Sequence, residues 1–440
     1  MYVADSRATT PASAEGAARP PRAGRRRAAV APTVLALGTV SLITDVSSEM
    51  VTAVLPLYLV TGLGLSPLGF GLLDGIYNGF SALVRLAGGH LADRGGGRHK
   101  WVAGLGYGIS ALCKPLLLLA HSLTPIGLVL AADRTGKGLR TAPRDALISL
   151  SSTPQTRGRS FGVHRAMDTA GALLGPLAAF LILRATVDGY DAVFTVSFCV
   201  AAVGVLVLVL FVPRGAAVQP TVDVDPAPHA HPAPPAALAP RPTLRAALAL
   251  LRRRDVRRVT ICALLLGLAT IGDSFVYLLL QRRLGVPDRW FALLPLGTAA
   301  AFLLLAVPLG RLADRVGRWR VFLAGHGALL GAYALLLTAW HGPALPYAVL
   351  LLHGAFYAAT DGVLMAAASD GVPEHLRSSG LAVVQTGQAL ARFACSLGFG
   401  AAWSLWGDRT ALLASTAALA LCAAVSVAFL RPATARKVPA

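Results

Sequence analysis

Several ionisable side chains of this chain lie inside long apolar stretches, where they can take part in proton or ion chemistry. Asp45 and Glu49 are four residues apart in the apolar stretch 33–60, so both carboxylates lie on one face of a predicted helix. In a medium of low dielectric, two neighbouring carboxylates raise the pKa of at least one of them, which suits reversible protonation. The alternative is a structural role, in which the pair bridges to a cation of another segment.

A second group of charges lies in the stretch 124–147. Asp133 and Lys137 fall on one helical stripe with Arg140 and Arg144, and Arg134 lies beside it. Such a stripe must face a cavity or partner carboxylates, because unpaired cations are costly in an apolar medium. It either attracts an anionic substrate or neutralises carboxylates such as Asp45, Glu49 and Asp168, and neutralisation is favoured for most of it. The pair Gly136-Lys137 lacks the flanking residues of a phosphate-binding loop.

Other candidates share helix faces at four-residue spacing. His164 and Asp168 can form a proton relay, or can hold Lys137 or Arg134 in place. In the second half of the chain the same spacing relates two further sets of side chains, namely Asp273 with Tyr277 and His353 with Tyr357 and Asp361. Asp74, Asn78 and Arg85 are interpreted instead as polar contacts between helices.

The elements that carry these residues are predicted to cross a membrane. Of the 440 residues, 55% are hydrophobic and 14% are charged, which is too apolar for a soluble domain of this size. Stretches of about 20 apolar residues are long enough to span a bilayer. Twelve spans are predicted: 33–60, 67–91, 101–120, 124–147, 160–183, 191–212, 257–281, 290–312, 320–340, 345–368, 380–402 and 410–430.

The distribution of cations predicts the topology. The net charge is +19, and the cations cluster between apolar stretches, as topology determinants do, which argues against nucleic-acid binding. Both termini are predicted to be cytoplasmic. Few cations then fall outside, and the pair Arg282-Arg283 is a local exception. Residues 1–30 are predicted to be a disordered tail and the Pro-rich segment 214–256 a cytoplasmic linker, with a short tail at 433–440.

Two short segments repeat across the halves of the chain. The first contains Gly89, Asp93, Arg94 and Arg98, and the second contains Gly310, Asp314, Arg315 and Arg318. Each lies between two apolar stretches and combines a tight, cationic turn with a carboxylate at the end of a helix. The glycines Gly89 and Gly310 are expected to allow close approach of a neighbouring helix. The repeat predicts two halves built on one plan.

These repeated segments resemble the signature loops of the major facilitator superfamily, which follow the second and eighth spans. The resemblance implies an all-α membrane protein with two six-helix bundles, 31–213 and 257–432, and a substrate site between them, lined by spans one, four, seven and ten. It also implies that the repeated segments close the cytoplasmic side. In the fifth span, Gly162, Gly171, Gly175 and Pro176 resemble the motif of drug:proton antiporters, although Ala179-Phe180 replaces its final glycines.

Two parts of the sequence suggest metal chemistry. His229 and His231, with Asp223 and Asp225, lie in the Pro-rich segment, which is a weak metal-binding pattern. The stretches 133–145 and 157–176 resemble nickel-resistance permeases of the same superfamily, yet the chain ends without their His-rich tail. Five scattered cysteines have neither metal nor disulfide spacing. No resident metal and no cofactor are assigned.

Together these features predict a secondary transporter that is not an enzyme. The hypothesis is proton-driven export of a small solute by a monomer in the bacterial cell membrane, with Asp45, Glu49, Asp168 and Asp273 as the proton and substrate carboxylates. The alternatives are a divalent-metal efflux permease and a proton symporter for an organic anion. A membrane-embedded enzyme would need a nucleophile–base pair or a metal cluster, and none has convincing spacing.

Overall fold

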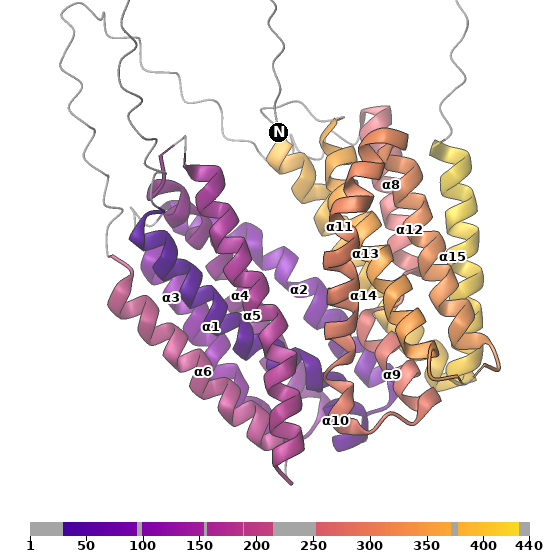
Figure 1. The fold of residues 1–440 in the computed structure, drawn as a ribbon, viewed down its shortest axis with the longest axis horizontal. Helices are drawn as coiled ribbons and strands as arrows, with labels where there is room; N and C mark the ends of the chain where they lie inside the picture. Colours follow the sequence, from indigo (N-terminus) through magenta and orange to yellow (C-terminus); the bar gives the residue numbers. More distant parts are fainter. Residues whose placement is uncertain are drawn as a thin grey trace, which may run out of the picture.

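The computed structural model describes residues 30–94, 99–153, 156–187, 189–213, 252–340, 342–370 and 377–430. In this part of the chain the secondary structure is helical. The helices form two bundles that converge at one end and diverge at the other, where the described chain begins and ends (Figure 1). The predicted all-α fold is therefore confirmed.

The N-terminal bundle contains the first six predicted spans. Its helices are α1 (Pro32–Leu57), which continues as the π-helical turn η1 (Tyr58–Gly62), α2 (Pro67–Arg94), α3 (His99–Leu119), α4 (Leu123–Leu150), α5 (Arg157–Ala185) and α6 (Gly189–Phe211). A close helix crossing in this bundle uses two glycines. A Cβ at Gly106 of α3 would lie 2.6 Å from the Gly136 carbonyl oxygen of α4, so a larger residue there would separate the two helices.

The C-terminal bundle contains the other six predicted spans. Its elements are α8 (Arg254–Ala269), α9 (Asp273–Leu284), α10 (Asp288–Phe291), α11 (Leu294–Val316), α12 (Arg318–Leu337), α13 (Leu345–Asp370), α14 (Arg377–Trp406) and α15 (Asp408–Leu430). The predicted spans 257–281 and 290–312 each consist of two helices. The other ten predicted spans coincide with one long helix each, α1 being extended by η1.

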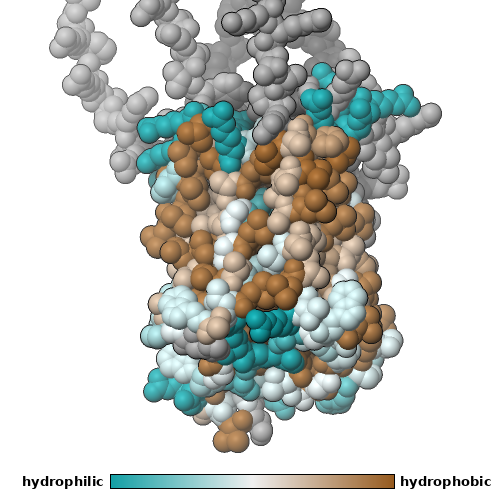
Figure 2. Space-filling model, turned by 90° about the vertical axis from the view of Figure 1, so that its right-hand side faces the viewer, coloured by the Kyte–Doolittle hydropathy of each residue, from teal (hydrophilic) through white to brown (hydrophobic). Residues whose placement is uncertain are grey.

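The surface of the bundles suits a bilayer. Within the described residues, eight helical segments are long and apolar enough to cross a membrane. Apolar residues cover the middle of the face that carries α12 and α15, and hydrophilic residues gather near its ends (Figure 2). The α4 helix falls outside the eight because it carries the predicted stripe of charges. Burying α4 among α1, α2 and α3 keeps those charges away from lipid.

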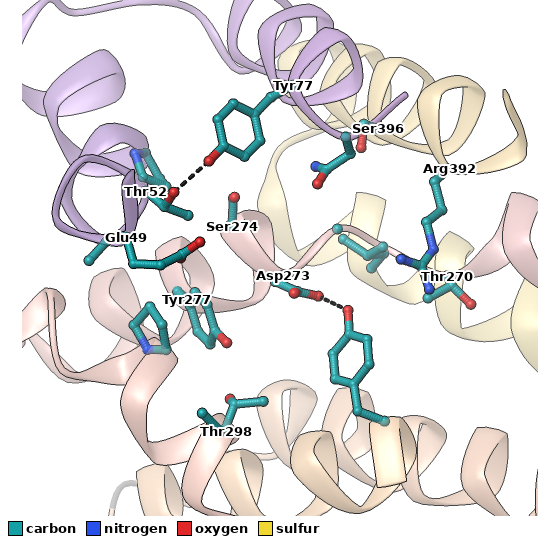
Figure 3. A pocket seen from close by; sticks show the side chains of 18 of the residues that line it. Glu49, Thr52, Tyr77, Thr270, Asp273, Ser274, Tyr277, Thr298, Arg392 and Ser396 are labelled. Carbon is teal, nitrogen blue, oxygen red and sulfur yellow. Dashed lines mark hydrogen bonds between the residues drawn. The ribbon is translucent and has the colours of Figure 1, made fainter. Parts of the chain in front are cut away.

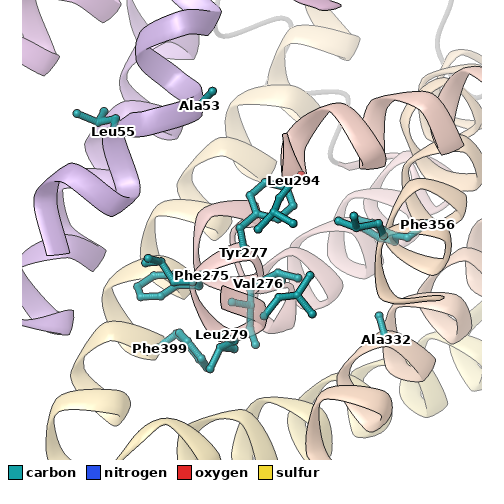
Figure 4. Close-up of a cluster of buried hydrophobic side chains, with 14 of the residues drawn as sticks. Ala53, Leu55, Phe275, Val276, Tyr277, Leu279, Leu294, Ala332, Phe356 and Phe399 are labelled. Carbon is teal, nitrogen blue, oxygen red and sulfur yellow. The ribbon is translucent and has the colours of Figure 1, made fainter. Parts of the chain in front are cut away.

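Part of the hydrophobic core lies where the two bundles converge. Phe275 of α9 packs edge-on against Phe70 of α2 and Phe399 of α14, with ring centroids 4.9 and 4.8 Å apart. Figure 4 shows the α9 side chains between α14 and the α1 residues Ala53 and Leu55. The α9 helix of the C-terminal bundle therefore packs against helices of both bundles.

Glycines allow close contact between the bundles at this end. A Cβ at Gly400 of α14 would lie 2.5 Å from the Pro67 carbonyl oxygen of α2, and a Cβ at Gly75 of α2 would lie 2.8 Å from the Phe393 ring. The Leu68 amide also donates a 2.9 Å hydrogen bond to Ser404 Oγ. We call this contact between residues 67–79 of α2 and 393–404 of α14 the α2–α14 closure.

Candidate functional site

A cavity of about 370 Å³ lies between the two bundles, beside the α2–α14 closure (Figure 3). This volume is in the range of small-molecule sites. The N-terminal bundle contributes residues of α1 and α2, and the C-terminal bundle contributes residues of α9, α11, α13 and α14 with the segment between α8 and α9. Its polar lining consists of Glu49, Thr52, Tyr77, Asn78, Thr270, Asp273, Ser274, Tyr277, Thr298, Tyr357, Asp361, Arg392 and Ser396.

The seventh span is interrupted at the cavity. Helix α8 ends at Ala269 and α9 begins at Asp273, so the three residues between them are extended. A broken helix in a membrane must satisfy its freed backbone groups. Here the Ile271 amide donates a 2.9 Å hydrogen bond to the Tyr333 hydroxyl of α12. The Ile271 amide at the break is therefore hydrogen-bonded within the protein. The break also places the first turn of α9 at the cavity.

Gly272 fits a tight space at this break. A Cβ at residue 272 would lie 2.7 Å from Asp74 Oδ2 and 3.3 Å from Ser396 Oγ, so a larger residue would displace the Asp74 carboxylate. Ser396 Oγ donates a 2.7 Å hydrogen bond to Asp74 Oδ2 across the two bundles. The predicted role of Asp74 as a polar contact between helices agrees with this geometry. The Arg85 side chain, predicted to act in the same way, lies outside the described residues.

Asp273 is the first residue of α9, and its carboxylate faces the cavity. The Tyr357 hydroxyl donates to its Oδ1, and His353 Nε2 lies 3.5 Å from the same atom. His353 is buried, and its Nδ1 lies 3.3 Å from Thr298 Oγ1. The Asp273 side chain remains 44% exposed, and it lies in the first turn of α9. The carboxylate is thus both held by the protein and accessible to a solute.

Glu49 lies on the opposite side of the cavity, on α1 (Figure 3). Helix α5 packs closely behind it, since a Cβ at Gly175 would lie 2.7 Å from the Glu49 Cβ. Asp361 of α13 and the Arg392 guanidinium of α14 complete the charged lining. The cavity thus presents three carboxylates and one guanidinium, together with the tyrosines Tyr77, Tyr277 and Tyr357.

The predicted contribution of the fourth span to the site differs from the structure. Among the described side chains, none from α4 lines this cavity; α2, α11 and α14 contribute instead. Asp133 forms an ion pair with Arg134 of 2.5 Å, accepts a 2.8 Å hydrogen bond from Ser110 Oγ and lies 3.9 Å from Lys114 Nζ. The Arg134 guanidinium stacks on the Tyr77 ring at 3.8 Å. This cluster is buried inside the N-terminal bundle, so sequence spacing identified its charges but not its closed surroundings.

We expect Asp133→Asn to destabilise the protein. Removing the carboxylate leaves Arg134 and Lys114 buried without their counter-ion, which costs roughly 3–5 kcal/mol for a buried pair. The apparent Tm of the detergent-solubilised protein should fall markedly. Asp145→Asn is the matched control, because its side chain is 45% exposed and pairs with Arg144 near the end of the same helix. Equal Tm values for the two variants would contradict the structural role of the Asp133 cluster.

Asp45 and Asp168 also have partners inside the N-terminal bundle. Asp45 Oδ1 lies 3.3 Å from Arg140 Nη2, and Asp168 Oδ1 lies 3.7 Å from Arg144 Nη1. Neither carboxylate lines the cavity beside the closure. Asp45 also differs from Asp273 in its setting, because α1 continues unbroken through Asp45.

His164 and Lys137 have different surroundings. His164 Nε2 lies 2.9 Å from Ser41 Oγ of α1, and no hydrogen bond joins His164 to Asp168 in the described part of the chain. Lys137 is half-buried on α4, and among the described residues no carboxylate lies within 4 Å of its ammonium group. Lys137 therefore differs from the arginines of the α4 stripe, each of which contacts a carboxylate.

The repeated turn segments are described only in part. The side chains of Gly89, Asp93, Arg94 and Arg98 lie outside the described residues. In the second copy, Gly317 has φ +103°, which explains the glycine in the turn, and Asp314 lies 3.9 Å from Arg318. Among the described residues, no atom lies within 4 Å of a Cβ built at Gly310, so the expected close helix contact is not seen there.

The antiporter-like motif of α5 is partly a packing device. A Cβ at Gly171 would collide with the Leu42 carbonyl oxygen of α1, and Gly175 is similarly close to α1. Gly162 has no neighbour within 4 Å of a built Cβ, so it does not take part in this contact. Pro176 lies within α5 without ending it. Close packing of α1 on α5 accounts for two of the three glycines.

The histidines and carboxylates of the Pro-rich segment lie outside the described residues. Within the described residues no three His, Cys, Asp or Glu side chains are grouped closely enough to hold a metal. Thr52, Ser274 and Thr298 line the cavity without having been predicted, because single hydroxyls in an apolar span give no distinctive sequence pattern.

Comparison with known proteins agrees with this architecture. The chain is 28% identical over 391 residues to an uncharacterized MFS-type transporter of Methanocaldococcus jannaschii, covering 88% of this chain and 92% of that protein. The crystal structure of the nucleoside transporter NupG matches with a TM-score of 0.74 at 15% identity, covering 91% of this chain and 99% of that one. A bacterial homolog of the human lysosomal transporter Spinster, in an inward-facing and unoccupied conformation, matches with a TM-score of 0.71 at 15% identity, covering 90% of this chain and 96% of that one.

The two-bundle fold and the cavity between the bundles thus occur together with similarity along nearly the whole chain. The sequence profile described as Major Facilitator Superfamily matches residues 37–396, which include parts of both bundles. The protein belongs to the major facilitator superfamily of membrane transporters.

Proposed function

We propose that this protein is a proton-coupled secondary transporter that exports a small cationic or zwitterionic solute from the cell by alternating access. The charge of the cavity carries this proposal. Glu49 on one bundle and Asp273 and Asp361 on the other face a space with a single lining guanidinium, Arg392, among the described residues. Carboxylates that are accessible and close to hydroxyl groups can exchange a proton for a positively charged solute.

The arrangement of the two bundles supports an inward-facing state. The bundles are closed through α2 and α14 at one end and diverge toward the end where the described chain begins and ends (Figure 1). With both termini in the cytoplasm, as the cations predict, the open end faces the cytoplasm. A cytoplasmic solute then has access to the cavity, and rocking of the bundles would expose it to the other side.

The cavity favours a cation over an organic anion. The sequence argument for an anion rested on the cations of α4, and three of them have carboxylate partners within the N-terminal bundle: Arg134, Arg140 and Arg144. Efflux of a divalent metal is a narrower form of the same proposal, since a metal cation would also be drawn to the carboxylate-lined cavity. The tyrosine-rich lining favours an organic cation.

Transport by purified protein in proteoliposomes with an imposed pH gradient tests the proposal. We expect an organic cation to move against its own gradient when protons move in the opposite direction, and we expect collapse of the pH gradient to stop this uphill movement. Nickel, cobalt and organic anions are assayed in parallel. Uphill movement of an anion together with protons, with no movement of cations, would contradict the proposal.

The Glu49→Gln variant provides a second test in the same assay. The amide preserves the size of the side chain against α5 but cannot bind or release a proton. We expect uphill transport of the cation to fall by about tenfold or more, as for loss of a charge-assisted contact. Asp191→Asn is the control, because Asp191 is exposed at the start of α6 and lies away from the cavity. A Glu49→Gln protein that transports as well as the control would remove Glu49 from the mechanism.

A further inference from the structure

A second cavity, of about 380 Å³, lies in the C-terminal bundle at the end where the two bundles converge. It is formed by the last turns of α9 and α12 and the first turn of α15. Its lining combines three arginines and one carboxylate with apolar side chains: Leu279, Arg282, Arg283, Leu336, Leu337, Thr338, Ala339, Asp408, Arg409 and Leu412. We call it the arginine pocket. It is separate from the cavity between the bundles and shares no residue with it.

The arginines of this pocket are held in place but not neutralised. Arg283 donates to the carbonyl oxygens of Leu336 and Thr338 at the end of α12, and its Nε is buried without a hydrogen-bond partner. The Arg282 guanidinium lies 5.0 Å from the centre of the Trp403 ring. In the described part of the chain, no carboxylate lies within 4 Å of Arg282, Arg283 or Arg409.

Asp408 does not cancel this charge. Its Oδ1 accepts a 2.7 Å hydrogen bond from the Arg409 amide at the start of α15, which is the position where a carboxylate stabilises a helix. Three guanidinium groups therefore face one carboxylate that is already engaged by backbone. The pocket carries an excess of positive charge, and it includes the pair Arg282-Arg283 that is an exception to the predicted charge distribution.

Two exposed tryptophans lie near the pocket. Trp340 follows α12, and Trp406 ends α14. Their side chains are 46% and 60% exposed. Tryptophan is enriched at the membrane–water interface, so this end of the helices is expected to lie at headgroup level. Hydrophilic residues gather at the lower end of the face that carries α12 and α15, below its apolar middle (Figure 2). A ligand in the pocket would have its polar part at this level and apolar parts along the leucines.

We propose that the arginine pocket binds the phosphodiester headgroup of an anionic phospholipid. Guanidinium groups match the geometry of phosphate oxygens and form charge-assisted hydrogen bonds with them. The volume exceeds that of a phosphate ion and accommodates a glycerophosphate headgroup, while Leu279, Leu337 and Leu412 offer an apolar wall to the first acyl carbons. This site is independent of the solute carried through the cavity between the bundles.

Lipid binding to the delipidated protein tests this proposal by native mass spectrometry. Phosphatidylglycerol is titrated against phosphatidylcholine, and inorganic phosphate is added in a separate arm. The test variant is Arg282→Gln with Arg409→Gln, because Arg283 also caps α12 and its loss would disturb folding. The control is Arg184→Gln with Arg289→Gln, which removes the same charge from exposed positions outside the pocket.

We expect the wild type and the control to retain phosphatidylglycerol in preference to phosphatidylcholine. The test variant should bind phosphatidylglycerol roughly tenfold more weakly, which corresponds to loss of charge-assisted hydrogen bonds. Equal binding by test variant and control would overturn the proposal, because it would assign the effect to net charge. Displacement of the lipid by millimolar inorganic phosphate would also overturn it, since the ligand would then be a free anion.

Discussion

Asp273→Asn should abolish uphill transport, with a loss of at least about 100-fold, comparable to removal of a positioned proton-transfer group. The carboxamide retains an oxygen that can accept from Tyr357 and can stay at the start of α9, so the fold should be preserved. What it loses is the charge and the ability to exchange a proton in the cavity. The measurement is solute accumulation in proteoliposomes under an imposed pH gradient.

Solute exchange without a pH gradient and a control variant distinguish a role of Asp273 in proton coupling from a role in solute binding. Solute exchange without a pH gradient should persist in Asp273→Asn if the carboxylate carries the proton, and should disappear if it binds the solute itself. Asp191→Asn is again the matched control, since Asp191 also lies in the first turn of a helix but is exposed. Unchanged uphill transport by Asp273→Asn would exclude this carboxylate from coupling.

Gly71→Leu and Gly400→Leu should prevent the bundles from closing at the α2–α14 contact. A Cβ at Gly71 would collide with the Ser396 carbonyl oxygen, and one at Gly400 would lie 2.5 Å from the Pro67 carbonyl oxygen. Such overpacking costs roughly 1–3 kcal/mol. If only the closed arrangement is penalised, its population relative to the open one falls by about 5-fold to 150-fold. Transport should slow because one state of the cycle becomes rare.

Spin labels can report this shift directly. Val187 and Leu405 are exposed at the same end of the two bundles, and the distance between labels there should lengthen in both variants. Gly398→Leu is the control on the same helix, since a Cβ at Gly398 meets no atom within 4 Å. All three substitutions share the same change in helix propensity, so an equal shift in Gly398→Leu would show that the closure contact is not the cause.

The fold could be predicted well because the clearest pattern in the sequence is a series of apolar stretches, and a bilayer strongly restricts the structure that such stretches can adopt. Apolar stretches of bilayer length must form helices, and each of the twelve predicted spans corresponds to a helix or a pair of helices. The interruption before Asp273 was not predicted. It contains no proline, and it depends on the Tyr333 hydroxyl and on the space around Gly272, which come from distant parts of the chain.

Only part of the candidate site could be predicted, because its geometry also depends on contacts between distant parts of the chain. Helical spacing grouped Asp273 with Tyr277, and Tyr357 with His353 and Asp361, and four of these five side chains line the cavity. Helical spacing could not distinguish Glu49 from Asp45, which lies one turn away on the same helix. Glu49 lines the cavity, whereas Asp45 pairs with Arg140. Whether a buried charge faces an opening or a partner depends on the neighbouring helices. Ser396 shows this most clearly, because α14 brings it to the cavity from a distant part of the chain.

The interruption of the seventh span has a mechanical consequence. Gly272 abuts Asp74 and Ser396 at the junction of the two bundles, and the next residue, Asp273, lines the cavity. Under the proposed function, solute binding and closure of the bundles would therefore act on adjacent residues of the chain. A small rotation of α9 about the peptides before Asp273 would move the Asp273 carboxylate and loosen the contact between the bundles at the same time. Solute binding and opening would then be coupled through one short segment.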